Sequence, residues 1–262
     1  MDFSEIKEIK ADATISFGPN CRGAEALRRN KLRFFSGPFD WMMKYDLKSV
    51  FDALKNKGEG FFSDFIQDGE DRKKKFRYMV SKSTGMVSMH HFRNNLPVDE
   101  AYYVFKNTMK RRFKELDKIF NDAETLVIIT SRKQETAEII PFIKDFLTLY
   151  EFQKLYFINI FDSPEEKIEK EEFNNVTIYN CFFKDVHPDG SDPNINKKFW
   201  KGNMEYWDMI LSKISLNKEF IRKYRIHKFL SNLFKKDLKT SLKLFYINSK
   251  CKLFRTFKIK AD

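Results

Sequence analysis

The chain has 262 residues, and 49 Lys and Arg against 37 Asp and Glu give it a formal net charge of +12 at pH 7. No apolar run approaches the roughly 20 residues needed to span a bilayer, and the polar start Met1-Asp2-Phe3-Ser4-Glu5 does not resemble a signal peptide, which favours a cytoplasmic protein. Three cysteines without a C-x-x-C pair argue against a disulfide framework and against a cysteine-rich zinc site.

The first predicted strand, residues 13–17, leads directly into a helix. Gly18-Pro19 interrupts the β-prone run, and good helix formers begin at Cys21. In the first turn of a helix, unpaired N–H groups and the positive end of the helix dipole favour a thiolate over a thiol. We therefore interpret Cys21 as a nucleophile, with a buried packing residue as the alternative. Asn20 supplies a side-chain amide that could donate to an oxyanion beside the Cys21 N–H.

The remaining elements predict an α/β fold. In chain order they are an irregular connection over 32–41, a short helix over 46–56, a hairpin of strands 76–80 and 86–90, an amphipathic helix over 99–120, a strand over 126–130, a helix over 134–150, strands over 154–160 and 176–182, a loop around 188–193 and a helix over 199–215. A strand, helix, strand succession usually forms a right-handed parallel crossover. We expect a three-layer body whose central sheet is mostly parallel and flanked by helices, with Cys21 at the carboxyl end of the first strand, where ligands bind in open α/β sheets.

A cysteine nucleophile needs a base, and usually a third group that orients this base. We expect His90 to be the base, and His187 is the alternative. Asp40, fixed between Phe39 and Trp41 after a Gly-Pro turn, is the first candidate orienter, and Asp185 beside His187 is the alternative one. The structural reading of these residues remains open, because strand-end histidines are often structural and Asp40 could cap a turn or a helix.

Further residues are candidates for substrate binding, because guanidinium groups pair with phosphates and carboxylates and strand ends present polar groups. They are Gly18, Arg28, Arg29, Arg33, Ser36, Trp41, His91, Ser131 and Arg132. The sequence contains no Walker loop, Rossmann glycine fingerprint, H-E-x-x-H or EF-hand motif, so it offers no positive evidence for a nucleotide or metal mechanism. Of the other cysteines, Cys181 is expected in the core, and Cys251 has no evident partner.

Several of these segments together resemble a bacterial family of papain-like cysteine peptidases of uncharacterised function. The blocks are Ser16-Phe17-Gly18-Pro19-Asn20-Cys21 followed by Ala24, Ala26 and Leu27-Arg28-Arg29, then Leu32-Arg33 with Ser36-Gly37-Pro38-Phe39-Asp40-Trp41, His90-His91-Phe92, and Trp200-Lys201-Gly202 to Trp207. They extend over about residues 13–210. His91 departs from the family pattern, in which an acidic residue is expected.

The resemblance implies a thiol-dependent hydrolase or acyltransferase with Cys21 as the nucleophile and His90 aligned with the family's histidine. It also implies an association with the biosynthesis of a surface polysaccharide, such as capsule or lipopolysaccharide. A similar capsule-biosynthesis family suggests coenzyme A as an acyl donor, although no cofactor is certain. The alternatives are a non-catalytic module that binds a glycan or scaffolds the synthesis machinery, and a true cysteine peptidase.

The positive charge is concentrated at the carboxyl end, where residues 218–262 hold 14 Lys or Arg against Glu219, Asp237 and Asp262. We therefore expect an α/β catalytic domain over 1–217 and a basic amphipathic helical tail over 218–262. Apolar residues recur in this tail at helical spacing, which fits a helix on an anionic membrane surface, peripheral on the inner membrane. A basic helix packed on the body, or a partly disordered tail, is an equal alternative, and nucleic acid is an unlikely partner. The apolar residues are Ile226, Phe229, Leu230, Leu233 and Leu238.

Overall fold

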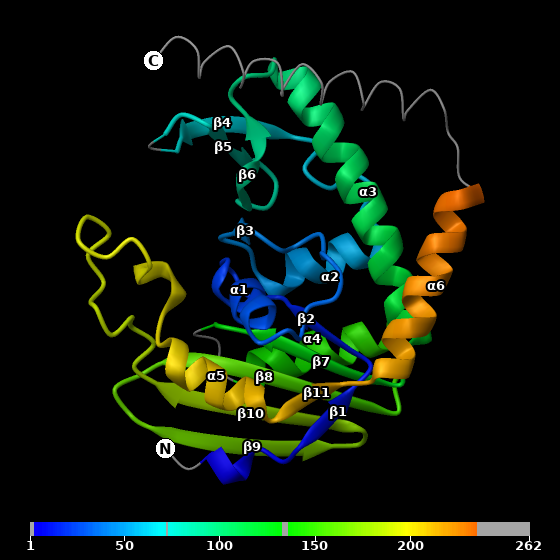
Figure 1. Cartoon of the computed structure of the whole chain (residues 1–262), viewed down its shortest axis with the longest axis vertical. Helices are drawn as coiled ribbons and strands as arrows, with labels where there is room; N and C mark the ends of the chain where they lie inside the picture. Colours follow the sequence, from blue (N-terminus) through cyan, green and yellow to red (C-terminus); the bar gives the residue numbers. More distant parts are fainter. Residues whose placement is uncertain (1–2, 72, 133–135, 235–262) are drawn as a thin grey trace.

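A computed structural model describes residues 3–71, 73–132 and 136–234 (Figure 1). Its elements are η1 (Phe3–Glu5), β1 (Ile9–Ala11), β2 (Ala13–Ser16), α1 (Arg22–Arg29), β3 (Met42–Met43), α2 (Leu47–Lys55), β4 (Phe65–Glu70), β5 (Phe76–Ser81), β6 (Val87–Arg93), α3 (Val98–Asp122), β7 (Thr125–Thr130), α4 (Thr136–Leu149), β8 (Lys154–Asp162), β9 (Lys167–Phe173), β10 (Val176–Phe183), η2 (Phe199–Lys201), α5 (Met204–Ser212), β11 (Ile214–Leu216) and α6 (Lys218–Phe234).

The centre of the fold is a five-stranded sheet in the order β2-β7-β8-β10-β9. Strands β2, β7, β8 and β10 run parallel, and β9 runs antiparallel to β10. Strands β7 and β10 are buried along almost their whole length, as expected of parallel strands that are covered on both faces. The predicted α/β fold with a mostly parallel sheet is confirmed.

Helices cover both faces of this sheet (Figure 1). On one face, Leu27 of α1 and Trp207 of α5 join the strand residue Ile158 in a single apolar cluster. On the other face, Phe120 of α3 and Phe146 of α4 join Phe157 in a second and larger cluster. Neighbouring residues of one strand, such as Phe157 and Ile158, therefore serve opposite layers, as the alternation of side chains along a strand requires.

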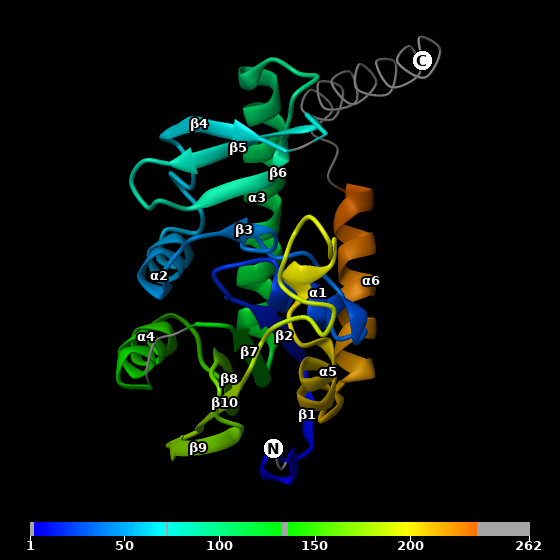
Figure 2. The ribbon, with the colours of Figure 1, turned by 90° about the vertical axis from the view of Figure 1, so that its left-hand side faces the viewer.

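A second sheet, in the order β3-β6-β5-β4, is antiparallel and contains the predicted hairpin as β5 and β6. It lies toward one end of the molecule, and the long helix α3 runs from this sheet to the five-stranded one (Figures 1 and 2). Phe105 of α3 packs on Phe92 of β6, with 4.9 Å between the ring centroids, whereas Phe120 packs near the first sheet. The helix therefore fixes β6 relative to the strand that leads to Cys21.

The predicted helix over 199–215 is wrong, because three short elements occupy these residues. Gly202 has a φ of 67°, a left-handed conformation that ends η2, and the Asn203 side chain then caps α5 by accepting from the Tyr206 N–H. After α5 the chain forms β11, which pairs in parallel with β1. Strand β9 was also not predicted, because Lys and Glu dominate its sequence, as is common at the edge of a sheet.

At the carboxyl end, α6 packs beside α3 (Figure 2), where Lys228 and Tyr224 bond to Glu115. The rest of the predicted tail, including Leu238 and Cys251, lies outside the described residues. None of the helices in the described part of the chain combines the length and the apolar character that a membrane crossing requires.

Candidate active site

Cys21 lies where the chain passes from β2 into α1, at the carboxyl edge of the five-stranded sheet. It is the N-cap residue of α1, and its carbonyl accepts the first helical hydrogen bond from Glu25, at 3.0 Å. A Cβ on Gly23 would come within 2.4 Å of Ser16 Oγ, so only a glycine lets α1 approach β2 this closely. The close contact fixes the cysteine relative to the end of the strand, as the sequence predicts.

A cavity of about 760 Å³ opens beside this residue. We call it the Cys21 cavity, and its lining is drawn from four separate parts of the chain. The lining residues are Asn20, Cys21, Arg22, Trp41, Met43, Met89, His90, Phe199 and Trp200. The predicted nucleophile and the predicted base therefore line one cavity, although no hydrogen bond joins the Cys21 sulfur to a histidine among the described residues.

An irregularity in β6 presents His90 to the cavity. Met79 of β5 pairs with Ser88, and Arg77 pairs with Phe92, so β6 holds two more residues than β5 between these pairs. Bulges of this kind redirect side chains and are common next to active sites. Met89 and His90 consequently both line the cavity, although successive residues of a regular strand point to opposite faces.

His90 is held between two aromatic rings and is neutral at pH 7. Its ring meets Trp41 and Phe76 edge-on, each with 6.1 Å between centroids. Partial removal from water lowers the pKa of His90 below its ordinary value of 6.5, and the negative charge of Asp71 only partly offsets this. A neutral imidazole can accept a proton, which is what a general base requires.

His91 points away from this role, because both of its nitrogens are engaged. Nδ1 lies 2.9 Å from Ser88 Oγ, and Nε2 lies 3.4 Å from Nη1 of Arg112. Since arginine only donates, Nε2 must accept and the Nδ1–H must donate to Ser88. Burial, with the charge of Arg112 second, lowers the pKa of His91 to about 3. The predicted substrate-binding role of His91 has no support from its position, which faces α3.

The expectation of a stabilised thiolate at Cys21 is not met. Burial raises the pKa of the thiol to about 12, and the negative charge of Asp40 adds to this effect. The arginines that follow Cys21 do not offset it, because each is paired elsewhere: Arg22 with Asp185, Arg28 with Glu25 and Arg29 with Asp208. In the free protein the sulfur is therefore a thiol.

Asp40, the predicted orienter, is buried and bonds to other groups. Its Oδ2 accepts from the Gly37 N–H at 3.0 Å and forms an ion pair with Arg33 at 2.9 Å. Burial raises the pKa of Asp40, while Arg33, the Gly37 N–H and Arg112 oppose the rise. None of the hydrogen bonds found among the described residues joins it to a histidine, so its position matches the alternative reading, a residue that fixes the turn before Trp41.

The predicted oxyanion donor, Asn20, holds the loop before the helix. Its Oδ1 accepts from the Arg22 N–H at 2.9 Å, and its Nδ2 donates to Ser131 Oγ at 3.2 Å. Ser131 follows β7, so this bond ties the Cys21 loop to the next strand of the sheet. Gly18 lies against the same residue, since a Cβ on it would approach the Ser131 N at 3.5 Å. Gly18 and Asn20 thus both contact Ser131, which fixes the loop that precedes Cys21.

The predicted substrate-binding arginines bond to the protein itself. Arg132 is buried and donates to the carbonyls of Tyr45 and Phe17 at 2.7 and 2.8 Å. Arg33 donates to Ser36 Oγ at 2.7 Å in addition to its pairing with Asp40, and Arg29 makes a bidentate contact with Asp208. Among the candidates, Trp41 lines the cavity, and its backbone adopts a left-handed φ of 68°, which is rare for a bulky residue.

The alternative pair, His187 and Asp185, does not line the Cys21 cavity. Asp185 is buried and joins three segments, because it receives bonds from Arg22, the Asn203 N–H and Trp207 Nε1. A Cβ on Gly202 would come within 2.1 Å of Asp185 Oδ1, which explains the glycine after Trp200. His187 is also buried, and its Nδ1 accepts from the Asp189 N–H at 3.1 Å.

The apolar lining of the cavity was only partly found from the sequence. Met43, Met89 and Phe199 were not predicted to lie at the site, and Trp200 was noted only within a family block. Met89 directly precedes His90, and in a regular strand the two side chains would point to opposite faces. The bulge in β6 brings both to the cavity, and the sequence did not indicate this bulge. Arg22 was also missed, and its bond to the Trp200 carbonyl at 3.0 Å connects the helix start to η2.

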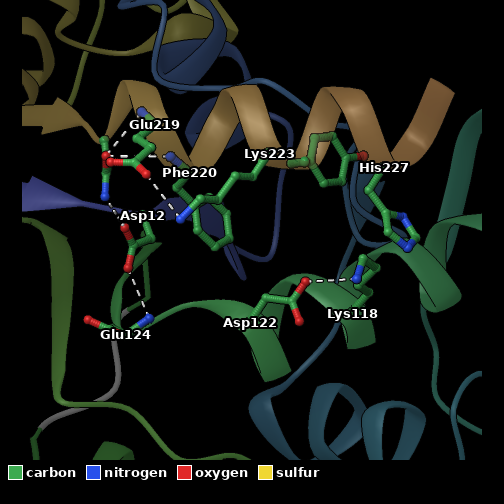
Figure 3. A pocket seen from close by; sticks show the side chains of 10 residues that line it. Asp12, Lys118, Asp122, Glu124, Glu219, Phe220, Lys223 and His227 are labelled. Carbon is green, nitrogen blue, oxygen red and sulfur yellow. Dashed lines mark hydrogen bonds and ion pairs between the residues drawn. The ribbon is translucent and has the colours of Figure 1, made fainter. Parts of the chain in front are cut away.

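A second hollow, of about 560 Å³, lies between α6 and the end of α3 (Figure 3). Its polar groups are engaged in structural bonds: Asp12 accepts from the Glu124 and Thr125 N–H groups and from Asn217. Lys118 pairs with Asp122, and Lys223 pairs with Glu219 (Figure 3). It contains no cysteine, and its only lining histidine is His227 on α6. The Cys21 cavity is therefore the candidate active site.

Comparison with known families matches residues 12–159 to the family described as "Putative papain-like cysteine peptidase (DUF1796)". The matched residues include Cys21, Asp40 and His90, and they end before Phe199 and Trp200. No curated protein and no solved structure matches the chain.

Proposed function

The chain belongs to this family of papain-like cysteine peptidases, and from that premise we propose that it is a cysteine-dependent acyl-transfer enzyme, with Cys21 as the nucleophile and His90 as the general base. The observation that carries the proposal is that both side chains line one cavity at the carboxyl edge of the sheet. A nucleophile and a base must be able to reach the same reacting group, and a shared cavity makes this possible.

The proposed reaction has two steps. The Cys21 sulfur attacks the carbonyl carbon of an ester, thioester or amide while His90 takes the thiol proton. The bond to the leaving group then breaks, and the leaving group takes the proton from His90, which leaves an S-acyl cysteine. In the second step, water or a hydroxyl group attacks this thioester, His90 takes its proton, and the cysteine sulfur leaves and is reprotonated by His90. Water as acceptor makes the enzyme a hydrolase, and a sugar hydroxyl makes it a transferase.

The raised pKa of Cys21 determines how the first step begins. A thiol with a pKa of about 12 beside a neutral histidine does not form a resting thiolate–imidazolium pair. The proton therefore moves from Cys21 to His90 as the acyl group is attacked, which is general-base catalysis. We assign the developing oxyanion to a backbone N–H at the start of α1, since the Asn20 amide is bonded to Ser131 and Arg22.

The test is detection of the acyl-enzyme. The whole chain is incubated with a hexanoyl thioester at pH 8, and intact-mass and peptide mass spectrometry locate the added acyl group. We expect a hydroxylamine-labile adduct on Cys21 that forms at least tenfold faster than on free glutathione. An adduct that forms no faster than on glutathione, or not at all, contradicts the proposal. The Cys181→Ala variant is the matched control, because Cys181 is buried in the core and does not line the cavity.

Two observations favour a second function. The raised thiol pKa and the absence, among the described residues, of a hydrogen bond from Cys21 to histidine also suit a non-catalytic module that binds a glycan or a scaffold partner. In that case the cavity binds its ligand without forming an adduct. True peptidase activity is the remaining candidate function, and it would use the same S-acyl intermediate. Release of new amino termini from a peptide library would distinguish it from acyl transfer to a hydroxyl group.

The finer assignment is a role in bacterial surface-polysaccharide biosynthesis, which rests on the resemblance of the sequence blocks that contain Cys21, Asp40, His90 and Trp200. A coenzyme A thioester is the donor in keeping with that resemblance. Arg22, the one arginine in the cavity lining, is paired with Asp185, so the cavity suits the acyl end of such a donor better than its phosphates.

We also propose that α6 brings the protein to the cytoplasmic face of the inner membrane. Ile226, Phe229 and Leu230 are 51, 63 and 46% exposed, while Tyr224 of the same helix is buried against the body. Exposed apolar residues on a helix with an excess of Lys and Arg suit an anionic lipid surface.

Co-sedimentation of the whole chain with vesicles tests this placement. We expect binding to mixed phosphatidylglycerol and phosphatidylcholine but not to phosphatidylcholine alone, and Phe229→Glu should weaken it. Ile66→Glu is the control, because Ile66 is similarly exposed, at 50%, but lies on β4. Equal binding by wild type and Phe229→Glu would contradict the proposal.

A further inference from the structure

The apolar side chains that line the Cys21 cavity come from three separate elements of the fold. Trp41 and Met43 come from the β3 segment, Met89 comes from the β6 bulge, and Phe199 and Trp200 come from η2. Each of these five side chains is partly exposed and does not belong to either apolar core cluster. These five side chains therefore form an apolar surface that faces the same cavity as Cys21.

The polar groups of the lining are already engaged. The Arg22 side chain bonds to Asp185 and to the Trp200 carbonyl, and Asn20 bonds to Ser131 and to the Arg22 N–H. His90 is neutral at pH 7, because its pKa is lowered. The lining side chains thus offer no free cation to a carboxylate or a phosphate. An extended peptide, which brings one N–H and one C=O per residue, would also find few side-chain partners.

Two features fix the shape of this lining. Trp41 is held in its left-handed conformation by its surroundings: Arg33 lies over its ring at 5.8 Å, and His90 meets it edge-on. A strained backbone at a ligand-facing residue is typical of functional sites. The two methionines, in contrast, are flexible and polarizable and adapt to different apolar groups. The volume of about 760 Å³ is in the usual range for small-molecule sites.

We propose that this lining is the acyl-binding subsite of the enzyme and that it selects donors with an uncharged aliphatic acyl chain. This inference rests on the proposed function, since the chain must be delivered to Cys21. The carbonyl would lie at the sulfur, and the hydrocarbon would extend between the two tryptophans and the two methionines. A carboxylate or phosphate within the chain would have to be buried there without a partner, which is strongly unfavourable.

A series of N-alkyl iodoacetamides tests the proposal on the whole protein. Ethyl, butyl and hexyl reagents, and a hexyl reagent that ends in a carboxylate, are compared by the rate of Cys21 alkylation, followed by peptide mass spectrometry. Each buried methylene strengthens binding by up to about fourfold. We expect the hexyl reagent to react at least tenfold faster than the ethyl reagent, and the carboxylated reagent to lose this advantage.

Variants separate the subsite from the nucleophile. Met89→Ala and Trp200→Ala should each reduce the hexyl-to-ethyl ratio at least threefold, whereas Met209→Ala, on the exposed surface of α5, should leave it unchanged. Alkylation of Cys21 at one rate by all reagents, or a preference for the carboxylated one, overturns the acyl subsite and leaves the nucleophile in place. No alkylation of Cys21 by any reagent, with the protein folded, overturns the proposed function itself.

Discussion

Cys21 and Cys181 are both buried thiols of the same α/β body, and their surroundings differ in what the sulfur can reach. Cys181 lies within β10, is 0% exposed and belongs to the apolar cluster under α1 and α5. Cys21 follows β2, is 9% exposed and lines a cavity that also contains a histidine. Burial raises the pKa of both thiols above the ordinary value. Acidity therefore does not distinguish them, and access to a cavity with a base does.

The most severe test of this comparison removes each sulfur in turn. Cys21→Ala should reduce hydrolysis of 4-nitrophenyl hexanoate by at least ~10³-fold, because it removes the sulfur on which the proposed acyl intermediate forms. Cys181→Ala should leave the rate unchanged and lower the free energy of unfolding by about 1 kcal/mol, through loss of packing in the core. Ester kinetics and urea titration measure the two effects. Equal rates for Cys21→Ala and the wild type would remove the distinction.

The second test concerns the base. His90→Gln should lower the same rate by ~10²- to 10⁴-fold, the usual contribution of a general base, without changing the fold. His187→Gln distinguishes the alternative base, and we expect it to leave the rate within a fewfold of the wild type, because His187 does not line the Cys21 cavity. Circular dichroism checks that both variants are folded. A larger loss in His187→Gln than in His90→Gln would reverse the assignment.

A pH profile sharpens the comparison between Cys21 and an ordinary thiol. The pKa of Cys21 is raised from 9.0 to about 12, so its thiolate fraction below pH 9 is smaller than that of a free thiol. Alkylation of Cys21 by iodoacetamide should therefore rise about tenfold per pH unit from pH 7 to 10, whereas the rate for a free thiol levels off near pH 9. Asp40→Asn should move the profile to lower pH, because it removes a nearby negative charge. A plateau of the wild-type profile below pH 9 would contradict the raised pKa.

The last test concerns the stability of the segment that completes the cavity, and no effect on the reaction rate is predicted from it. Gly202 and Gly85 have nearly the same left-handed φ, 67° and 68°, but a Cβ would collide with Asp185 and Arg22 only at Gly202. Replacing either glycine by alanine should destabilise the protein by about 1–3 kcal/mol through backbone strain. Gly202→Ala should lose a further 1–3 kcal/mol, approximately, from overpacking. Denaturant titration of both variants measures the difference, and equal losses would show that Asp185 and Arg22 move aside freely.

Much of the fold could be predicted from hydrophobic patterns. Fully apolar runs such as Leu126-Val127-Ile128-Ile129 predict buried parallel strands, and the long amphipathic helix follows from its spacing of Phe and Met. Strand β9 escaped prediction because its Lys and Glu side chains resemble a solvent-exposed loop. The break at Gly202 escaped because a single glycine does not show whether its backbone is left-handed.

The candidate site was predicted where a residue depends on local structure and not where it depends on distant partners. Cys21 follows from a strand-to-helix junction, and His90 from a strand. The state of the thiol could not be predicted, because it depends on burial by other segments and on Asp40, which reaches it only through the folding of the loop after α1. The arginines mislead for the same reason, since the sequence does not show that Arg22 reaches Asp185 or that Arg29 reaches Asp208.

The contacts among Arg22, Asp185 and Gly202 affect how the cavity can change in related sequences. The proposed nucleophile and the proposed base lie within residues 12–159, whereas Phe199 and Trp200 belong to a later segment that these contacts anchor next to the start of α1. Two of the five apolar side chains of the proposed subsite are thus encoded apart from Cys21 and His90, whereas Trp41, Met43 and Met89 lie within the same matched residues. Substitutions at Phe199 and Trp200 can therefore alter part of the cavity wall without changing residues 12–159, provided that Arg22 and Asp185 keep this segment next to α1.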